Sequence, residues 1–146
     1  MAFGLSLGGT AMLATFSMPV NAIVSGSGEW FFRGFGDFNG DGKTDLFWHN
    51  SNTGDISAWL MNGDRVSQYT SYDDVPFSSG WHLRGFGDFN GDGKTNLFWY
   101  NSNTGETSAW LMNGDRVSQY TSYDKVSSSS GWHLRGFGDF NGDGKT

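Results

Sequence analysis

Residues 36–45 read GDFNGDGKTD, and the interpretation of the whole chain depends on this stretch. It recurs as GDFNGDGKTN at 87–96 and as GDFNGDGKT at 138–146. Each copy concentrates carboxylate and amide side chains between glycines, a composition that forms tight turns. An ordinary Asp/Asn/Gly turn is therefore one interpretation. Because the spacing is the same in every copy, a ligand-binding loop is the interpretation that we favour.

The stretch belongs to a longer tandem repeat. Trp30, Trp81 and Trp132 open near-copies spaced 51 residues apart (81 − 30 and 132 − 81). Segments 30–80 and 81–131 differ at nine positions, so 42 of 51 positions match. A period near 50 residues indicates a propeller, a solenoid or an array. In such folds each unit buries its apolar faces against its neighbours.

One repeat unit is predicted to contain four strands. Alternation with period two places them at 30–38, 45–50, 56–61 and 65–72. Asn62-Gly63, between the last two strands, is a strong signal for a two-residue hairpin turn. The strands grade from apolar to polar along the unit, so the last one suits an outer rim.

Two of these strands are apolar on both faces. Leu46 and Trp48 share one face of 45–50, and Phe47 lies on the other. Ile56 and Trp59 likewise point to opposite faces of 56–61. Such a sheet needs cover on both sides, as a β-propeller blade has from its neighbours. We predict an all-β chain of four-stranded antiparallel β-propeller blades in tandem. A β-sandwich would not need an exact period, and a β-helix would need shorter coils.

The chain is predicted to divide into a leader and successive blades. The expected segments are a leader at 1–28, one blade at 29–80, a second at 81–131, and the first strand and partial loop of a third at 132–146. A propeller needs more blades than this. Further blades could come from the same chain, if it is a fragment, or from other copies that close a ring.

The leader and the net charge bear on localisation and partners. Residues 1–28 contain no charged residue and resemble a secretory signal peptide, with a buried or disordered strand as the alternative. We therefore expect a secreted or cell-surface protein. Gly8-Gly9 and Pro19 interrupt the apolar run, so no membrane span is expected. A net charge of −6 argues against nucleic-acid binding.

A phosphate-binding role for the acidic stretch is unfavourable. Gly42-Lys43-Thr44 matches the end of a phosphate-binding loop, but Asp37 stands where that loop needs its first glycine. Carboxylates would repel phosphate. The segment that follows also has a strand pattern, whereas a phosphate loop is followed by a helix.

A hard cation fits the acidic stretch better. Asp37, Asn39 and Asp41 occupy loop positions one, three and five, the Lys43 carbonyl position seven, and Asp45 position nine. These ligands are all oxygens, which Ca²⁺ prefers, whereas zinc and copper sites favour His or Cys.

The loop resembles one known repeat family. The pattern D-x-N-x-D-G-x-x-D between two strands, preceded by Phe35-Gly36, resembles the FG-GAP/VCBS repeats, the calcium-binding blades of integrin-like β-propellers. The resemblance covers 30–146. An EF-hand is excluded because it needs flanking helices and a Glu at position twelve, where Trp48 stands on a strand.

The resemblance implies Ca²⁺ sites in the copies of the loop. The implied ligands are Asp37, Asn39, Asp41, Lys43 and Asp45 in the first loop, Asp88, Asn90, Asp92, Lys94 and Asn96 in the second, and Asp139, Asn141, Asp143 and Lys145 in the third, each lysine through its carbonyl. The second site is expected to be weaker because Asn96 is neutral where Asp45 is charged. The third lacks position nine and is expected to bind poorly.

No catalytic constellation is expected. His82 and His133 occupy the repeat position of Phe31, and His49 aligns with Tyr100, so these histidines are interpreted as packing residues. The acids outside the loops mostly lie beside predicted turns.

The favoured function is an extracellular, calcium-stabilised scaffold for adhesion or for binding a protein or other ligand. One alternative is a lectin-like propeller that binds a glycan, and another is a non-catalytic accessory domain of a secreted enzyme. The aromatic candidates for stacking on a sugar are Trp59, Trp110, Tyr69 and Tyr120, although core packing is the more common role.

Overall fold

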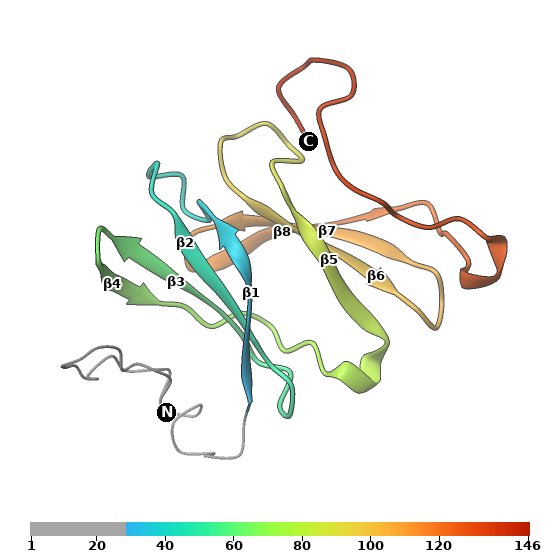
Figure 1. Cartoon of the computed structure of the whole chain (residues 1–146), viewed down its shortest axis with the longest axis horizontal. Helices are drawn as coiled ribbons and strands as arrows, with labels where there is room; N and C mark the ends of the chain where they lie inside the picture. The colour runs from blue at the N-terminus through green and yellow to red at the C-terminus, as the bar shows by residue number, and fades with distance from the viewer. Residues whose placement is uncertain (1–28) are drawn as a thin grey trace.

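The computed structural model describes residues 29–146, which form two four-stranded antiparallel sheets (Figure 1). The first sheet contains β1 (Trp30–Gly36), β2 (Asp45–Asn50), β3 (Ile56–Asn62) and β4 (Arg65–Tyr69). The second contains β5 (Trp81–Gly87), β6 (Asn96–Asn101), β7 (Thr107–Asn113) and β8 (Arg116–Tyr123). Two 3-10 turns follow the sheets, η2 (Phe77–Ser79) and η3 (Ser128–Ser130). The all-β prediction is confirmed, while the predicted leader lies outside the described residues.

Each sheet is a meander in which strand order equals chain order. The two sheets also share an irregularity in their strand pairing. The register between the first and second strands shifts at a β-bulge, between Phe32 and Gly34 in β1 and between Leu83 and Gly85 in β5. The described residues build two such sheets and no closed ring of blades. Among them, no helix is long and apolar enough to span a bilayer.

The turn between β3 and β4 differs slightly from its prediction. Asn62 pairs with Arg65, so the two-residue loop consists of Gly63 and Asp64, one residue later than expected. Gly63 adopts φ 69°, which a glycine reaches without steric cost. The predicted hairpin is therefore confirmed with a shifted turn.

Strand β4 is also shorter than expected. It ends at Tyr69, whereas the prediction extended to residue 72. The Thr70 hydroxyl accepts a hydrogen bond from the Ala58 backbone N–H at 2.8 Å and donates one to the Ala58 carbonyl at 2.9 Å. The side chain thus enters the ladder beside the backbone, which closes the strand early.

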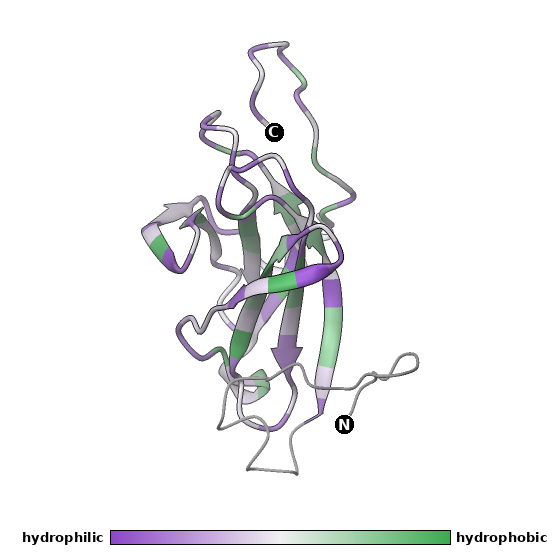
Figure 2. Ribbon diagram, turned by 90° about the vertical axis from the view of Figure 1, so that its left-hand side faces the viewer, coloured by the Kyte–Doolittle hydropathy of each residue, from purple (hydrophilic) through white to green (hydrophobic). Residues whose placement is uncertain are grey.

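Both faces of the first sheet are apolar, as the alternation predicted. Phe47 is fully buried, and with Ile56 and other side chains it forms the core between the two sheets. Leu46 and Trp48 pack around Trp59 on the opposite face. Figure 2 shows how the apolar residues concentrate on the strands and the polar residues in the loops.

Phe86 of the second sheet inserts into the first sheet. Its ring centroid lies 5.9 Å from that of Phe38 and 5.6 Å from that of Phe47. The β1 bulge makes room for it at Gly34, where a methyl group would stand 2.5 Å from the Phe86 ring. A side chain at Gly34 would therefore separate the sheets.

Residues 132–146 correct one prediction, because this segment contains no strand. β1 pairs with β2 and β5 with β6, and no corresponding partner strand is present for 132–138 among the described residues. The packing of the repeat nevertheless persists. Phe137, the third counterpart of Phe86, lies 5.5 Å from Phe89 and 5.1 Å from Phe98, ring centroid to ring centroid.

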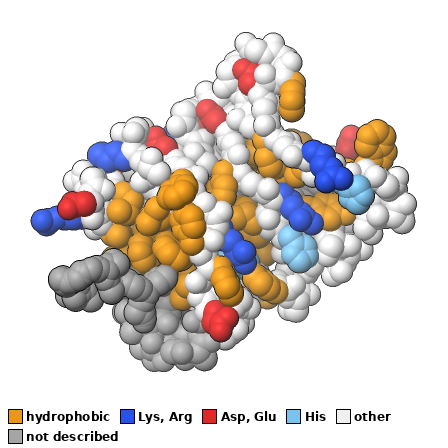
Figure 3. All heavy atoms as spheres, viewed as in Figure 1, with side chains coloured by type: hydrophobic (Ala, Val, Ile, Leu, Met, Phe, Trp, Pro, Cys, Tyr) orange, Lys and Arg blue, Asp and Glu red, His pale blue; other side chains and the backbone are white. Residues whose placement is uncertain are grey.

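The face of the first sheet that points away from the second carries exposed aromatic side chains. Phe32 and Phe35 are exposed there, and Phe32 packs edge to face on Phe35 and on Trp48. Hydrophobic side chains gather over this sheet in the space-filling view (Figure 3).

We predict that Phe86→Ala destabilises the protein by about 2–3 kcal/mol, less than a fully buried Phe because the side chain is only half-buried. The loss should be measured by urea unfolding. Phe31→Ala is the matched control, since that ring is 41% exposed and should cost little. Equal losses in the two variants would contradict the role given to Phe86.

Candidate metal-binding loops

The aspartate at loop position one shapes the loop. Asp37 Oδ1 accepts hydrogen bonds from the backbone N–H groups of Gly40 at 2.7 Å and Asp41 at 3.0 Å. Its Oδ2 accepts from Gly42 N–H at 2.8 Å. Because one carboxylate gathers three amides, the chain is held in a tight turn with the other polar side chains close by.

The other two loops repeat this arrangement. Asp88 accepts from Gly91, Asp92 and Gly93 at 2.8, 3.1 and 2.9 Å. Asp139 accepts from Gly142, Asp143 and Gly144 at 2.7, 3.0 and 2.8 Å. These bonds, that from Gly144 foremost, hold the pKa of Asp139 below its usual value. The third loop lacks flanking strands, so its own residues are sufficient to form the turn.

Position nine of the first loop is a buried carboxylate. Asp45 is fully buried, with Oδ2 accepting from Phe38 N–H at 3.0 Å and Oδ1 from Met61 N–H at 2.9 Å. Burial raises the pKa of Asp45, and the charges of Asp41 and Asp37 raise it further, against the lowering effect of the two backbone bonds. The three carboxylates therefore repel one another, and a cation among them would relieve that repulsion.

Position nine of the second loop has different hydrogen bonding. Asn96 Oδ1 accepts from Met112 N–H at 3.0 Å, as Asp45 does from Met61. Its Nδ2 donates to Asn90 Oδ1 at 3.3 Å. The Asn96 side chain therefore directs an N–H donor toward the loop. This donor occupies Asn90 Oδ1, an oxygen that a bound cation would need. This geometry gives a second physical reason, besides charge, for a weaker second site.

Each loop also contains an internal ion pair that was not predicted. Lys43 Nζ lies 3.0 Å from Asp41 Oδ2, and the corresponding distances are 3.6 Å for Lys94–Asp92 and 3.9 Å for Lys145–Asp143. The hydrogen bond from Lys43 is the main cause that lowers the pKa of Asp41. A bound cation would compete with the lysine ammonium for the Asp41 carboxylate. From the sequence, only the backbone carbonyl of this lysine was expected to take part in the site.

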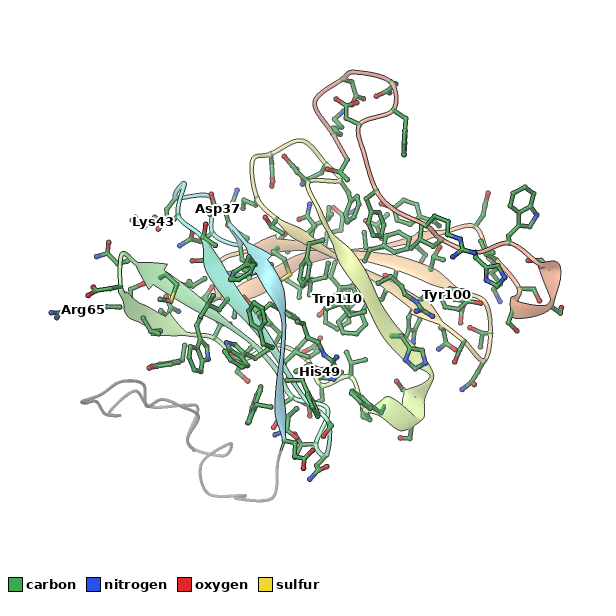
Figure 4. The ribbon with its side chains drawn as sticks, viewed as in Figure 1. Asp37, Lys43, His49, Arg65, Tyr100 and Trp110 are labelled. Carbon is green, nitrogen blue, oxygen red and sulfur yellow. The ribbon has the colours of Figure 1, made fainter. Side chains whose placement is uncertain are left out.

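The donor chemistry of the loops fits a hard cation. Carboxylates have about four lone-pair sites, so Asp37 and Asp45 retain accepting capacity beyond the bonds described. Among residues 29–146, however, no three acidic, His or Cys side chains are already gathered into a metal cluster. Figure 4 shows Asp37 and Lys43 in the loop between β1 and β2. A cation would therefore draw the side chains of this loop together.

Neighbouring loops are joined by a pair of hydrogen bonds, which we call the inter-loop clasp. Thr95 donates its N–H to the Asp37 carbonyl at 2.7 Å, and Asp37 N–H donates to Thr95 Oγ1 at 2.9 Å. Thr146 and Asp88 form the same pair at 2.9 and 3.1 Å. This threonine follows the lysine in every copy of the loop, but nothing in the sequence pattern predicted that it joins two loops.

His49 occupies a structural position, whereas His82 and His133, which were also interpreted as packing residues, are exposed. His49 is 3% exposed, and its Nε2 donates to the Val75 carbonyl at 3.0 Å. In the second unit the Tyr100 hydroxyl donates to the Val126 carbonyl at the same distance. The two side chains thus make equivalent hydrogen bonds, in line with their interpretation as packing residues.

The four aromatic candidates for sugar stacking divide between two surroundings. Trp59 and Tyr69 pack edge to face, with ring centroids 5.4 Å apart, within the outer cluster of the first sheet. Trp110 and Tyr120 pack edge to face at 5.0 Å, and Trp110 also packs against the core between the sheets. The Tyr120 hydroxyl donates to Asp73 Oδ2.

We predict that Thr95→Val lowers the free energy of unfolding by about 1–2 kcal/mol, because Asp37 N–H loses its acceptor while the side-chain shape is kept. Chemical denaturation measures the loss. Thr44→Val is the matched control, since Thr44 holds the same loop position but is exposed. A control that loses as much stability as Thr95→Val would rule out the clasp as the cause.

We predict that His49→Tyr reduces the acid sensitivity of the fold. Burial is the main cause that lowers the pKa of His49, so below its unfolded pKa of 6.5 the unfolded chain takes up a proton that the native state does not. Stability is therefore lost as the pH falls from about 7 to about 5, and tyrosine should remove this part of the loss. Melting curves across that range provide the measurement. His82→Phe, on an exposed site, should keep the original pH dependence.

The comparisons with known proteins agree with the repeat and its loops. The model of the FG-GAP-like repeat matches twice, over residues 37–99 and 88–146. No curated protein and no solved structure matches the chain. The two matches together cover more than half of the sequence, and each begins at the first aspartate of a loop. The chain therefore belongs to the FG-GAP-like repeat family.

Proposed function

We propose that this protein is a calcium-stabilised scaffold of the β-propeller type that acts outside the cell, in adhesion or in binding a protein or other ligand. In this proposal it has no catalytic role of its own. Ca²⁺ is held by the side chains of loop positions one, three, five and nine and by the lysine carbonyl. FG-GAP-like repeats by themselves suggest a propeller-like binding scaffold, and the cation, the location and the adhesive role are the parts that we add.

The electrostatics of the first loop carry the proposal. Burial is the main cause that raises the pKa of Asp45, and the charges of Asp41 and Asp37 raise it further. A divalent cation among these oxygens would convert mutual repulsion into attraction. The ligand set is oxygen-only, which suits Ca²⁺ in a flexible loop.

Calcium bound in this way would stabilise the stack of sheets as well as the loop. Asp37 is both the first proposed ligand and a partner in the inter-loop clasp with Thr95. Ordering Asp37 would therefore also order the hydrogen bonds to the second sheet. Because the unfolded chain does not present these ligands together, the binding free energy adds to the free energy of unfolding.

We predict that calcium raises the melting temperature of the full chain relative to a chelator. The expected stabilisation is about 2.7 kcal/mol for one site when free calcium is one hundredfold above its Kd. Differential scanning calorimetry in millimolar CaCl₂ and in EGTA measures it, with NaCl added to match ionic strength. Identical melting curves would refute the proposed role of calcium.

Exchanging the ninth loop residues assigns the effect to the loops. Asn96→Asp restores a charged ligand and should enlarge the calcium-dependent shift in melting temperature, whereas Asp45→Asn should reduce it. Asp64→Asn, on an exposed hairpin turn, is the control for the change of charge. Equal calcium shifts in all three variants would place the cation elsewhere.

A further inference from the structure

A pocket of about 330 Å³ lies at the junction of the two sheets, away from the acidic loops. The connection from β4 to β5 contributes Asp73 and Asp74 to its wall. The second sheet contributes Trp81, Trp99 and Trp110. We call these five residues the junction pocket, and nothing in the proposed function uses it.

The aromatic wall of the junction pocket is a packed row. Trp99 is 1% exposed, and its ring centroid lies 5.1 Å from that of Trp110. Trp110 packs edge to face on Tyr120, and the Tyr120 hydroxyl donates a hydrogen bond to the Asp73 carboxylate. Figure 4 shows Trp110 between the two sheets. The row thus fixes one carboxylate close to the indole rings.

The acidic wall has no counter-charge. Although its side chain is exposed overall, partial loss of solvent, a hydrogen bond to Asp55 and the charges of Asp55 and Asp73 raise the pKa of Asp74. The ion pairs found within residues 29–146 involve other aspartates. Arg33 instead places its guanidinium over the rings of Phe31 and Phe77, at 5.3 and 5.8 Å. Negative charge therefore accumulates at the pocket without a Lys or Arg partner.

The repeat offers an internal comparison. Residue 74 is one of only nine positions that differ between the copies, and its counterpart in the second unit is Lys125. Asp73 keeps its charge in the counterpart Asp124. The second unit thus supplies its own ammonium group at the position where the first unit has an extra carboxylate.

We propose that the junction pocket binds an organic ammonium group, either a primary or a quaternary one. Indole faces attract cations through their quadrupole, and carboxylates beside them neutralise the charge. An ammonium ligand would bring to the first unit the positive charge that the second unit carries at this repeat position, on Lys125. A neutral sugar would stack on the indoles but would leave the carboxylates uncompensated.

Choline is the probe, because it is a small quaternary ammonium that both the carboxylates and the indole rings of the pocket would attract. It is titrated into the full chain with calcium present, following tryptophan fluorescence and the indole N–H signals in NMR spectra. We expect saturable binding that 3,3-dimethylbutan-1-ol, the neutral isostere of choline, matches only at concentrations about tenfold higher or more. n-Butylammonium, which mimics the end of a lysine side chain, tests whether the pocket also accepts a primary ammonium.

The second unit supplies the decisive variant. Asp74→Lys should weaken choline binding about tenfold or more, because it introduces the residue of the second unit and its own cation. Asp64→Lys makes the same change of charge on an exposed turn and should bind choline like the unmodified chain. Asp74→Asn should fall between them. Since residues 64 and 74 are both exposed, all three variants are expected to fold, which their melting curves verify.

Several results would overturn the inference. These are equal affinity for choline and its neutral isostere, unchanged binding in Asp74→Lys, and the absence of any saturable choline response. Glucose saturating the same indole signals while choline does not would make the pocket a carbohydrate site instead. The calcium-dependent melting of the chain is a separate measurement, so either proposal can fail alone.

Discussion

The inter-loop clasp is the constraint on which the rest of the structure depends. Two hydrogen bonds join Asp37 of one loop to Thr95 of the next, across 58 residues of sequence. They set the distance between the sheets at their loop end, and Phe86 fills the space behind them. The same clasp and the same aromatic contact recur between Asp88 and Thr146 and at Phe137, where no strand has formed. Packing between units therefore needs only the loop and one ring from the following unit.

The clasp also explains how one residue can serve two purposes. The Asp37 side chain folds its own loop by gathering three amides, while its backbone holds the next loop. A cation at the Asp37 carboxylate would thus act on a turn that already carries the contact between sheets. At the other end of the stack, the junction pocket lies where the two copies of the repeat diverge in charge. The positions that are identical in the two repeat units form the packing between the sheets. A few positions that differ, such as Asp74, give the junction its charge.

Much of the fold could be predicted because strand alternation and turn composition are local properties. The pattern of 45–50 placed Phe47 and Trp48 on opposite faces, and the sheets bear this out. The errors arose where a tertiary partner intervenes. The Thr70 hydroxyl closes β4 early, and residues 132–138 remain without a strand because a strand forms only against a neighbour.

For the candidate sites, the sequence by itself determined the kind of ligand atoms and their spacing, because the turn is made by adjacent residues whose bonds form even outside a sheet. Only the tertiary structure decided which face of each sheet is covered, that Thr95 reaches Asp37, and that Asp74 meets Trp110 at one pocket. Contacts between residues far apart in the chain depend on how the two sheets stack. That stacking is set by the inter-loop clasp and by the fit of Phe86 against Gly34, and none of these residues predicts it alone.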